Sequence, residues 1–193
     1  MLFKPSRAKA LRFFPPVDVV FEDNHEEYGR VFFPLLSVDL TAVDRSLSGW
    51  LHLVYFNNDP YNEATVPYFT SYCGESSLGF DVMQGRYRLQ TDLRYFDLTS
   101  EWEEPFEATR TTYSEAKAAS DEQGQRFELD QVPLGGEPEW TQDDETPVDP
   151  SGEPMRFVTQ YDTANSIGDG CDKVIYLFYS PTHKIAVQVA QTT

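Results

Sequence analysis

The amino-acid sequence predicts an α+β protein built mainly from antiparallel β-structure, with one or a few short helices. Short segments rich in β-branched and aromatic residues recur along the chain, and Pro, Gly, Asn or Asp separate them. Only one segment has the composition of a convincing helix. The chain has 193 residues, of which 40% are hydrophobic and 15% aromatic, enough for one sizeable core. We therefore expect residues 1–193 to form a single domain.

Eight segments carry the strand pattern. They are Val17–Phe21, Arg30–Val38, Trp50–Phe56, Val66–Tyr72, Tyr87–Asp97, Arg156–Tyr161, Val174–Tyr179 and Lys184–Val189. Two of them differ in kind. Residues 87–90 alternate polar and apolar side chains, which predicts one solvent-facing side, whereas residues 175–178 are apolar throughout, which predicts burial on both faces. The second of these segments is therefore expected to be a central strand.

One helix is predicted, from about Tyr113 to Gln123, because Ser114 is placed to cap an Ala-rich run and Gly124 to end it. The downstream residues 134–154 are rich in Gly, Pro and acidic side chains and have no regular period. This composition predicts a long loop that contains Trp140. Loops of this length in compact domains are usually functional or disordered.

A weak internal repeat relates two predicted strand pairs. The first copy joins residues 33–39 (FPLLSVD) to 50–56 (WLHLVYF), and the second joins 156–162 (RFVTQYD) to 174–179 (VIYLFY). Asp39 precedes Tyr55 by 16 positions, and Asp162 precedes Tyr179 by 17. Two unrelated hairpins in one chain would show a similar degree of likeness, so duplication and coincidence both stay open at this point.

Charge is concentrated in one region, a predicted helix with loops at residues 101–153. This region carries 16 acidic residues against three basic ones, and it supplies 13 of the 17 net negative charges of the chain. Such a concentration accelerates association with a basic partner and repels nucleic-acid backbones and anionic membranes. We therefore expect a basic protein partner, with no nucleic-acid partner and no membrane partner.

Two tryptophans lie among these acids, Trp102 within EWEEPFE and Trp140 within EPEWTQDDE. Aromatic side chains at the centre of a binding patch supply much of the affinity, while the surrounding charges set rate and selectivity. Two plainer interpretations stand beside this one: the charge is a solvated face, and the tryptophans anchor loops to the core. The candidate partner-binding residues are Glu101, Trp102, Glu103, Glu104, Glu107, Glu139, Trp140, Asp143, Asp144 and Glu145.

Three motifs in the C-terminal third carry a family resemblance. GGEPEWTQ (135–142), PMRFVTQYD (154–162) and GDGCDKVIYLFYSPTHKIAVQ (168–188) resemble the YwqG-like family of bacterial proteins, mainly over residues 134–191. The resemblance implies a sheet-rich α+β fold with internal pseudo-repetition. It also implies kinship with programmed-cell-death-2 and ribosome-assembly chaperone families, which hold a basic ribosomal protein, and with bacterial immunity proteins of polymorphic toxin systems. The N-terminal half departs from the family pattern, since no second GGxPxW element precedes Arg30.

Sequence patterns typical of catalysis or metal binding are weak. Ser114 and Lys117 match a Ser-x-x-Lys pattern, but no companion motif follows. The histidines show no metalloprotease spacing, and Gly135-Gly136 lacks the Lys-Ser/Thr pair of a phosphate-binding loop. Cys73 and Cys171 stand 98 positions apart, which favours two free thiols. We expect no catalytic residues, no metal site and no cofactor.

These observations favour a non-enzymatic immunity protein that binds and neutralises a cognate basic toxin domain. The alternative is a chaperone or assembly factor that shields a basic ribosomal protein, as the resemblance implies. An enzyme whose residues meet only in three dimensions and an acidic mimic of DNA are weaker alternatives. The sequence has no apolar run long enough to cross a bilayer and no pattern typical of a secretory signal, so a cytoplasmic location is expected.

Overall fold

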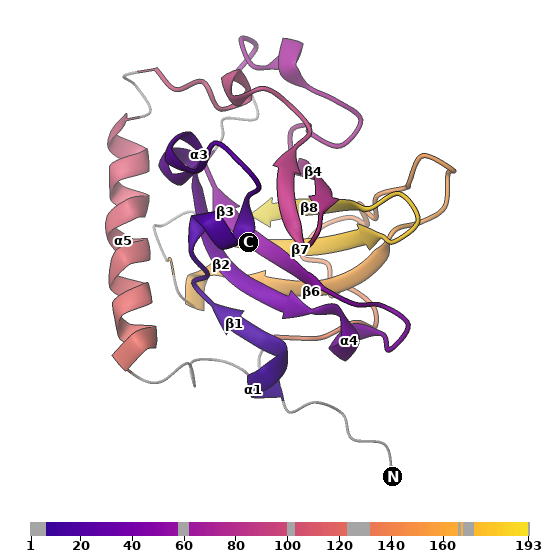
Figure 1. The fold of residues 1–193 in the computed structure, drawn as a ribbon. Coiled ribbons are helices and arrows are strands. Elements are labelled where there is room, and N and C mark those ends of the chain that lie inside the picture. The colour runs from indigo at the N-terminus through magenta and orange to yellow at the C-terminus, as the bar shows by residue number, and fades with distance from the viewer. Residues whose placement is uncertain are drawn as a thin grey trace.

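Two antiparallel sheets form the body of the protein in a computed structural model that describes residues 7–57, 62–99, 103–122, 132–165, 167 and 172–192 (Figure 1). The strands are β1 (Leu11–Phe13), β2 (Phe32–Asp39), β3 (Trp50–Phe56), β4 (Ser77–Met83), β5 (Arg86–Leu89), β6 (Arg156–Asp162), β7 (Lys173–Ser180) and β8 (Ile185–Thr192). The helices and 3-10 turns are α1 (Arg7–Ala10), α2 (Val17–Val20), α3 (His25–Val31), α4 (Leu40–Val43), η1 (Val66–Tyr68), η2 (Leu93–Phe96), α5 (Glu103–Glu122) and η4 (Thr163–Asn165). The predicted α+β class is confirmed.

The strand order separates the sequence into two sheets. One sheet has the order β1-β2-β3, and the other has the order β5-β4-β8-β7-β6. The predictions for β2, β3, β6, β7 and β8 are confirmed to within a few residues. β7 is an interior strand that is buried along its length, and β5 alternates exposed and buried side chains, as the two residue patterns predicted.

Three strand predictions were wrong in whole or in part. Val17–Val20 is a short helix that follows Pro16, and Val66–Tyr68 is a 3-10 turn with Pro67 in its first turn. In both segments proline fixes a backbone angle that suits the start of a helical turn, which outweighs the β-branched composition. The predicted strand Tyr87–Asp97 ends at Leu89 because the Asp92 side chain accepts the Arg94 N–H and begins the turn η2.

Two strands were missed, β1 and β4. β1 has only three residues, too few for a visible alternation. In β4 the alternation is interrupted by Gly79, where an added Cβ would come within 2.4 Å of the Tyr72 Cβ. This close approach of two chain segments requires glycine at position 79. Glycine disfavours a strand when the sequence is considered alone, but β4 needs it here.

The helix α5 is longer than predicted, since it begins at Glu103 rather than near Tyr113. Its first turns are acidic, which suits the positive end of a helix dipole, and Pro105 is tolerated there because the first N–H groups need no helical partner. Phe106 and Tyr113 lie on the face that packs on the core. This packing outweighs the low helix propensity of the intervening threonines. Ser114 is not a cap, because its hydroxyl donates to the Arg110 carbonyl oxygen within the helix. Gly124 lies outside the described residues.

The structure supports the internal repeat. We call residues 11–56 the N-terminal unit and residues 132–180 the C-terminal unit. The first strand of each pair, β2 and β6, carries a β-bulge at the same place, between Pro34 and Leu36 and between Phe157 and Thr159. Tyr55 and Tyr179 then occupy equivalent positions in the register. Two unrelated hairpins would not be expected to share this irregularity.

Both units also share hydrogen bonds at the end of the bulged strand and at the bulge itself. The last residue is an aspartate whose side chain accepts a backbone N–H two residues later, from Thr41 after Asp39 and from Ala164 after Asp162. At the bulge, the Leu35 carbonyl oxygen accepts the Phe14 N–H, and the Val158 carbonyl oxygen accepts the Gly135 N–H. Phe14 and Gly135 both have positive φ, 49° and 67°. The repeat therefore extends to the segment before each bulged strand.

The long loop predicted at residues 134–154 contains no helix or strand and covers one face of the five-stranded sheet. Trp140 packs on Tyr176 and Phe178 of β7, with ring centroids 4.4 and 5.7 Å away. Gln191 of β8 fixes the next residues, because its side chain accepts the Gln142 N–H and donates to the Asp143 carbonyl oxygen. The loop is therefore a fixed cover of the sheet.

Candidate functional site

A groove runs between α3, η2 and the first turns of α5. It consists of two adjoining cavities of about 510 and 330 Å³ that share Arg30, Leu98 and Thr99. The first cavity continues toward η1, and the second continues along α5. We call this feature the α3–α5 groove. Its lining residues are Glu27, Arg30, Ala64, Tyr68, Asp92, Leu93, Arg94, Asp97, Leu98, Thr99, Glu103, Phe106, Glu107 and Arg110.

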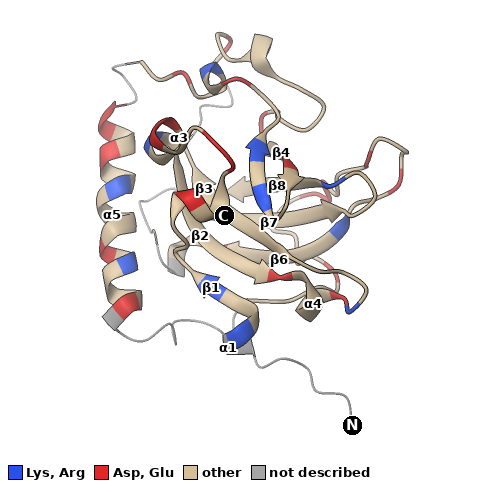
Figure 2. Ribbon diagram, in the orientation of Figure 1, with Lys and Arg blue, Asp and Glu red and all other residues tan. Residues whose placement is uncertain are grey.

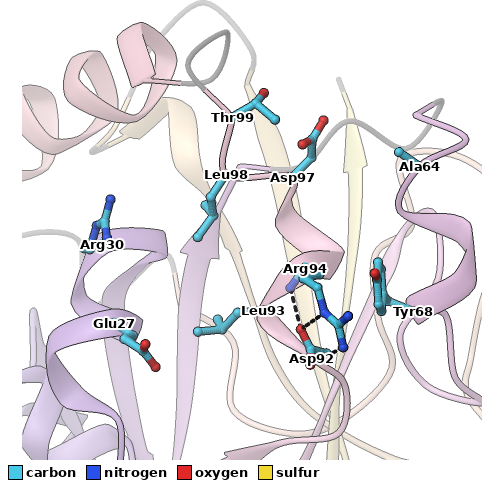
Figure 3. Close-up of a pocket in the computed structure, with 10 residues that line it drawn as sticks. All are labelled: Glu27, Arg30, Ala64, Tyr68, Asp92, Leu93, Arg94, Asp97, Leu98 and Thr99. Atoms are coloured by element: carbon cyan, nitrogen blue, oxygen red, sulfur yellow. Dashed lines mark hydrogen bonds and ion pairs between the residues drawn. The ribbon is translucent and has the colours of Figure 1, made fainter.

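Two leucines line the α3–α5 groove beside its polar and charged residues. Figure 3 shows Leu93 and Leu98 extending into the space between α3 and η2. Leu98 is 45% exposed, and the Phe106 ring is buried under the neighbouring cavity. A concave surface that combines apolar side chains with charged ones is common at protein binding sites.

One wall of the α3–α5 groove is held by an arginine. Arg94 forms two hydrogen bonds with the Asp92 carboxylate, at 2.8 and 2.9 Å, and its guanidinium lies over the Tyr68 ring at 4.6 Å (Figure 3). The hydrogen bonds from the Arg94 side chain and backbone lower the pKa of Asp92 to about 2. Asp92 is therefore a poor proton acceptor at neutral pH, and its role in the groove is to orient Arg94.

Acid prevails among the charges of the α3–α5 groove, since the described residues that line it include five carboxylates and three guanidinium groups. Arg94 and Arg110 are neutralised by ion pairs within the wall, with Asp92 and Glu107. In the part of the chain that the structure describes, Glu27 and Glu103 have no cationic group within ion-pair distance. Their carboxylates remain available to a basic group from outside.

The structure divides the predicted partner-binding residues between two surfaces. Glu103, Glu104 and Glu107 are exposed on the first turns of α5, and two of them line the α3–α5 groove. Glu101 and Trp102 precede this helix and lie outside the described residues. The remaining candidates, Glu139, Trp140, Asp143, Asp144 and Glu145, lie in the loop that covers the five-stranded sheet.

The loop acids form a surface of their own. Glu139, Asp143, Asp144 and Glu145 are exposed, and residues 132–155 contain seven acidic side chains and no lysine or arginine. The Asp144 carboxylate accepts the hydroxyl and N–H of Thr146, and these bonds lower its pKa. In Figures 1 and 2, α5 stands on the left, whereas the loop that leads into β6 projects on the right. The sequence therefore predicted both acidic groups but not their separation.

Trp140 serves the loop as an anchor. Its ring is partly buried against Tyr176 and Phe178, and Tyr176 also fixes the neighbouring backbone by donating to the Glu139 carbonyl oxygen and accepting the Thr141 N–H. Of the two interpretations of this tryptophan, the structure supports the anchor. Exposed apolar side chains lie beside acidic residues on both surfaces, Leu98 in the α3–α5 groove and Val148 in the loop.

The nearest approach to a nucleophilic site is a surface cluster of Ser151, His183 and Asp149. The Ser151 hydroxyl lies 3.2 Å from His183 Nε2, but it donates to Asp149 Oδ1 at 2.7 Å. Asp149 faces the same histidine nitrogen, at 3.6 Å, instead of orienting the ring through its other nitrogen. This geometry does not activate the serine, because its proton is directed to the carboxylate.

Other features concern metals, thiols and membranes. Within the described ranges, no group of three or more His, Cys, Asp or Glu side chains is arranged to hold a metal ion. Cys73 is a free, buried thiol whose pKa is raised by burial, and Cys171 lies outside the described residues. A search of the described helices finds none long and apolar enough to cross a membrane.

Comparison with protein-family models, with curated proteins and with solved structures finds no match for this chain. The resemblance to the YwqG-like family therefore remains an expectation from the sequence motifs. Two residues of the first motif, GGEPEWTQ, have clear structural roles: Gly135 takes a positive φ at the bulge of β6, and Trp140 covers β7. The function must be inferred from the surfaces of the molecule.

Proposed function

We propose that this protein is a non-enzymatic binding module for a basic protein and acts as an immunity protein that neutralises a cognate basic toxin domain. The observation that carries the proposal is the α3–α5 groove, which exposed Leu98 lines together with Glu27 and Glu103, two carboxylates without an ion-pair partner among the described residues. A lysine or arginine side chain fits such a site well, because its methylene groups pack on leucine while its charged end pairs with carboxylates.

The charge of the whole chain supports the same partner chemistry. A net charge of −17 attracts a basic domain over roughly one Debye length, about 8 Å at physiological salt, before any contact forms. Both acidic surfaces are fixed in advance, one on a 20-residue helix and the other on a loop held by Trp140 and Gln191. Surfaces that are fixed before binding lose less conformational entropy in the complex.

A second candidate is a chaperone for a basic ribosomal protein, and the separation of the two acidic surfaces favours it. α5 and the loop lie on different sides of the molecule in Figure 2. One compact toxin domain contacts one of these surfaces, whereas an extended basic chain can contact both. The two functions therefore differ in how many of the acidic surfaces the partner needs.

Affinity purification of the tagged protein from its native cell at low salt, followed by mass spectrometry, tests the proposal. The expected result is a stoichiometric partner with a high isoelectric point, either a toxin domain or a ribosomal protein. If purifications at low salt return no stoichiometric basic protein, the binding-module proposal fails.

Two charge-reversal variants then locate the partner. The groove variant carries Glu103→Lys and Glu104→Lys, and the loop variant carries Glu139→Lys and Asp143→Lys. Each pair changes the net charge equally, and all four residues are exposed. A toxin partner should be lost only with the groove variant, whereas an extended ribosomal partner should be weakened by both. Equal capture by both variants and the wild type would contradict the proposed surfaces.

A further inference from the structure

A second cleft lies between the N-terminal unit and the turn that joins β4 to β5. Its volume is about 410 Å³, and its lining includes Arg12, Trp50, His52 and Arg86. Arg12, Ser37 and His52 are neighbours in the strand register, so they form one row across the three strands, with Trp50 two residues from His52 on the same face. This face differs from the α3–α5 groove in both position and charge.

The floor of the cleft is fixed by a histidine whose two ring nitrogens are both bonded. The Gly85 carbonyl oxygen can only accept, so His52 Nε2 donates to it at 2.8 Å, and Nδ1 then accepts the Ser37 hydroxyl at 2.8 Å. The Tyr87 hydroxyl donates to the His52 carbonyl oxygen and accepts the His52 N–H. These bonds join the two sheets beneath the cleft, so its shape is set before any ligand arrives.

The cleft exists because the N-terminal unit lacks the tryptophan that covers the C-terminal unit. Trp140 stands five residues after Gly135, and Val19 stands five residues after the equivalent Phe14. Trp140 fills the space over Tyr176, which is equivalent to His52 in the register. Val19 is 41% exposed and lines the cleft instead. The smaller side chain leaves the corresponding face open.

The charges at the cleft are two arginines. Among the residues that the structure describes, no aspartate or glutamate lines the cleft, although the chain has 32 acidic residues. Neither Arg12 nor Arg86 has a carboxylate within ion-pair distance among the residues that the structure describes, whereas Arg88, on the same strand as Arg86, pairs with Glu22. Asp39 pairs with Trp50 in the register, and its carboxylate is bonded to Thr41.

Arg12 is also held in a suitable orientation. Its guanidinium lies over the Trp50 ring, 4.0 Å from the centroid. Stacking uses the flat face of the guanidinium and leaves its in-plane N–H groups free, and two parallel N–H donors match the oxygens of a carboxylate or phosphate. The negative charge elsewhere on the molecule weakens this attraction little, because charges beyond about 8 Å are screened at physiological salt.

We infer that this cleft binds the oxyanion group, a phosphate or a carboxylate, of a small molecule, with Arg12 and Arg86 as its ligands. The volume suits a small ligand. The inference is independent of the proposed function, because no residue that lines the cleft lines the α3–α5 groove.

Nuclear magnetic resonance of the protein with 15N-labelled tryptophan tests the inference, because Trp50 lines the cleft and Arg12 lies over its ring. Sodium phosphate and sodium acetate are titrated separately at constant ionic strength and pH, with sodium chloride as the blank. The expected result is a saturable shift of the Trp50 signal with at least one of the two anions, and the anion that gives it identifies the group. No saturable shift with either anion overturns the inference.

Three variants make the test specific. Arg12→Gln and Arg86→Gln should each weaken binding by about tenfold or more, since each removes a charge-assisted contact. Arg88→Gln is the matched control, because it removes the same charge from the same strand, and it should leave binding unchanged. Binding that survives Arg12→Gln, or that falls equally with Arg88→Gln, shows only general charge attraction and overturns the site.

Val19→Trp tests the origin of the cleft. It places in the N-terminal unit the side chain that covers the C-terminal unit, and it should abolish the saturable shift while the protein remains folded by circular dichroism. A folded Val19→Trp protein that binds the anion with wild-type affinity would contradict the placement of the site beneath Val19.

Discussion

The N-terminal and C-terminal units share a backbone plan and differ in what covers it. Each has a bulged strand, an aspartate that begins the following turn, and a positive-φ residue that donates to the bulge carbonyl oxygen. In the C-terminal unit Trp140 and its loop seal the outer face, whereas in the N-terminal unit that face carries Arg12, Trp50 and an open cleft. The hydrogen bond at the bulge is the same in both units, whereas the side chains that cover them differ.

The difference between the two units indicates which of the two faces is open to a ligand. The sealed face of the C-terminal unit contributes to stability, and its acidic loop presents charge to the outside. The open face of the N-terminal unit carries Arg12, which has no carboxylate within ion-pair distance among the described residues. Substitutions at equivalent positions of the two units should therefore have different effects on the stability of the protein.

The largest expected effect is the loss of Trp140. Trp140→Ala removes the ring that packs on Tyr176 and Phe178 and should lower the free energy of unfolding by about 3 kcal/mol. Val19→Ala, at the equivalent and exposed position, should change it by about 0.5 kcal/mol or less. Urea denaturation of the two variants measures both values. Equal losses would show that the two faces are covered alike.

The next effect concerns pH and His52. Burial, with a smaller contribution from Arg12, lowers the pKa of His52 from 6.5 to about 4. Between these two pKa values the unfolded chain binds a proton at His52, and the folded protein does not. Neutral His52 therefore stabilises the folded state fully above pH 6.5, and this stabilisation is lost as the pH falls toward 4. Lowering the pH from 7 to 4.5 should therefore reduce the free energy of unfolding by about 2.5 kcal/mol through His52.

His52→Gln separates this titration from the others. The variant should be less stable at pH 7, because it loses one of two buried hydrogen bonds, but its stability should fall less between pH 7 and pH 4.5. His25→Gln, at an exposed helix start, is the control and should keep the wild-type pH dependence. If the stability of His52→Gln fell as much between pH 7 and pH 4.5 as that of the wild type, His52 would not be the source of the pH dependence.

A smaller effect is expected at the bulge of the C-terminal unit. Gly135 has φ +67°, and an added Cβ would lie 3.2 Å from Val43 Cγ1, so Gly135→Ala should cost about 1–2 kcal/mol. Gly74→Ala is the control, since its Cβ would meet the Ser77 hydroxyl oxygen at an ordinary 3.5 Å. Unfolding in urea compares them, and a neutral Gly135→Ala would show that the bulge relaxes without cost.

Much of the fold follows from local patterns in the sequence. β3 was predicted to the residue, and the contrast between a half-buried β5 and a buried β7 was predicted from alternation alone. The three wrong strand predictions occurred where proline or an aspartate side chain determined the backbone, at α2, η1 and η2. Tertiary packing extended α5 by ten residues beyond the predicted start.

The candidate sites were harder to predict, because they depend on contacts between distant segments. Charge counting identified Glu103 and Glu107, but Arg94 and Leu98 join them only through the packing of η2 beside α3. Arg12 and Arg86 are 74 positions apart in the sequence. They line the same cleft because the turn that joins β4 to β5 lies beside His52, a contact between distant segments that no local pattern reveals.

The most direct test of the central claim is the association rate of the captured basic partner with the wild type, the groove variant and the loop variant, measured from low to physiological salt. The wild-type rate should fall steeply with salt, and Glu103→Lys with Glu104→Lys should slow association most and flatten that dependence. A wild-type rate that does not change with salt, or a groove variant that associates as fast as the wild type, would contradict the account.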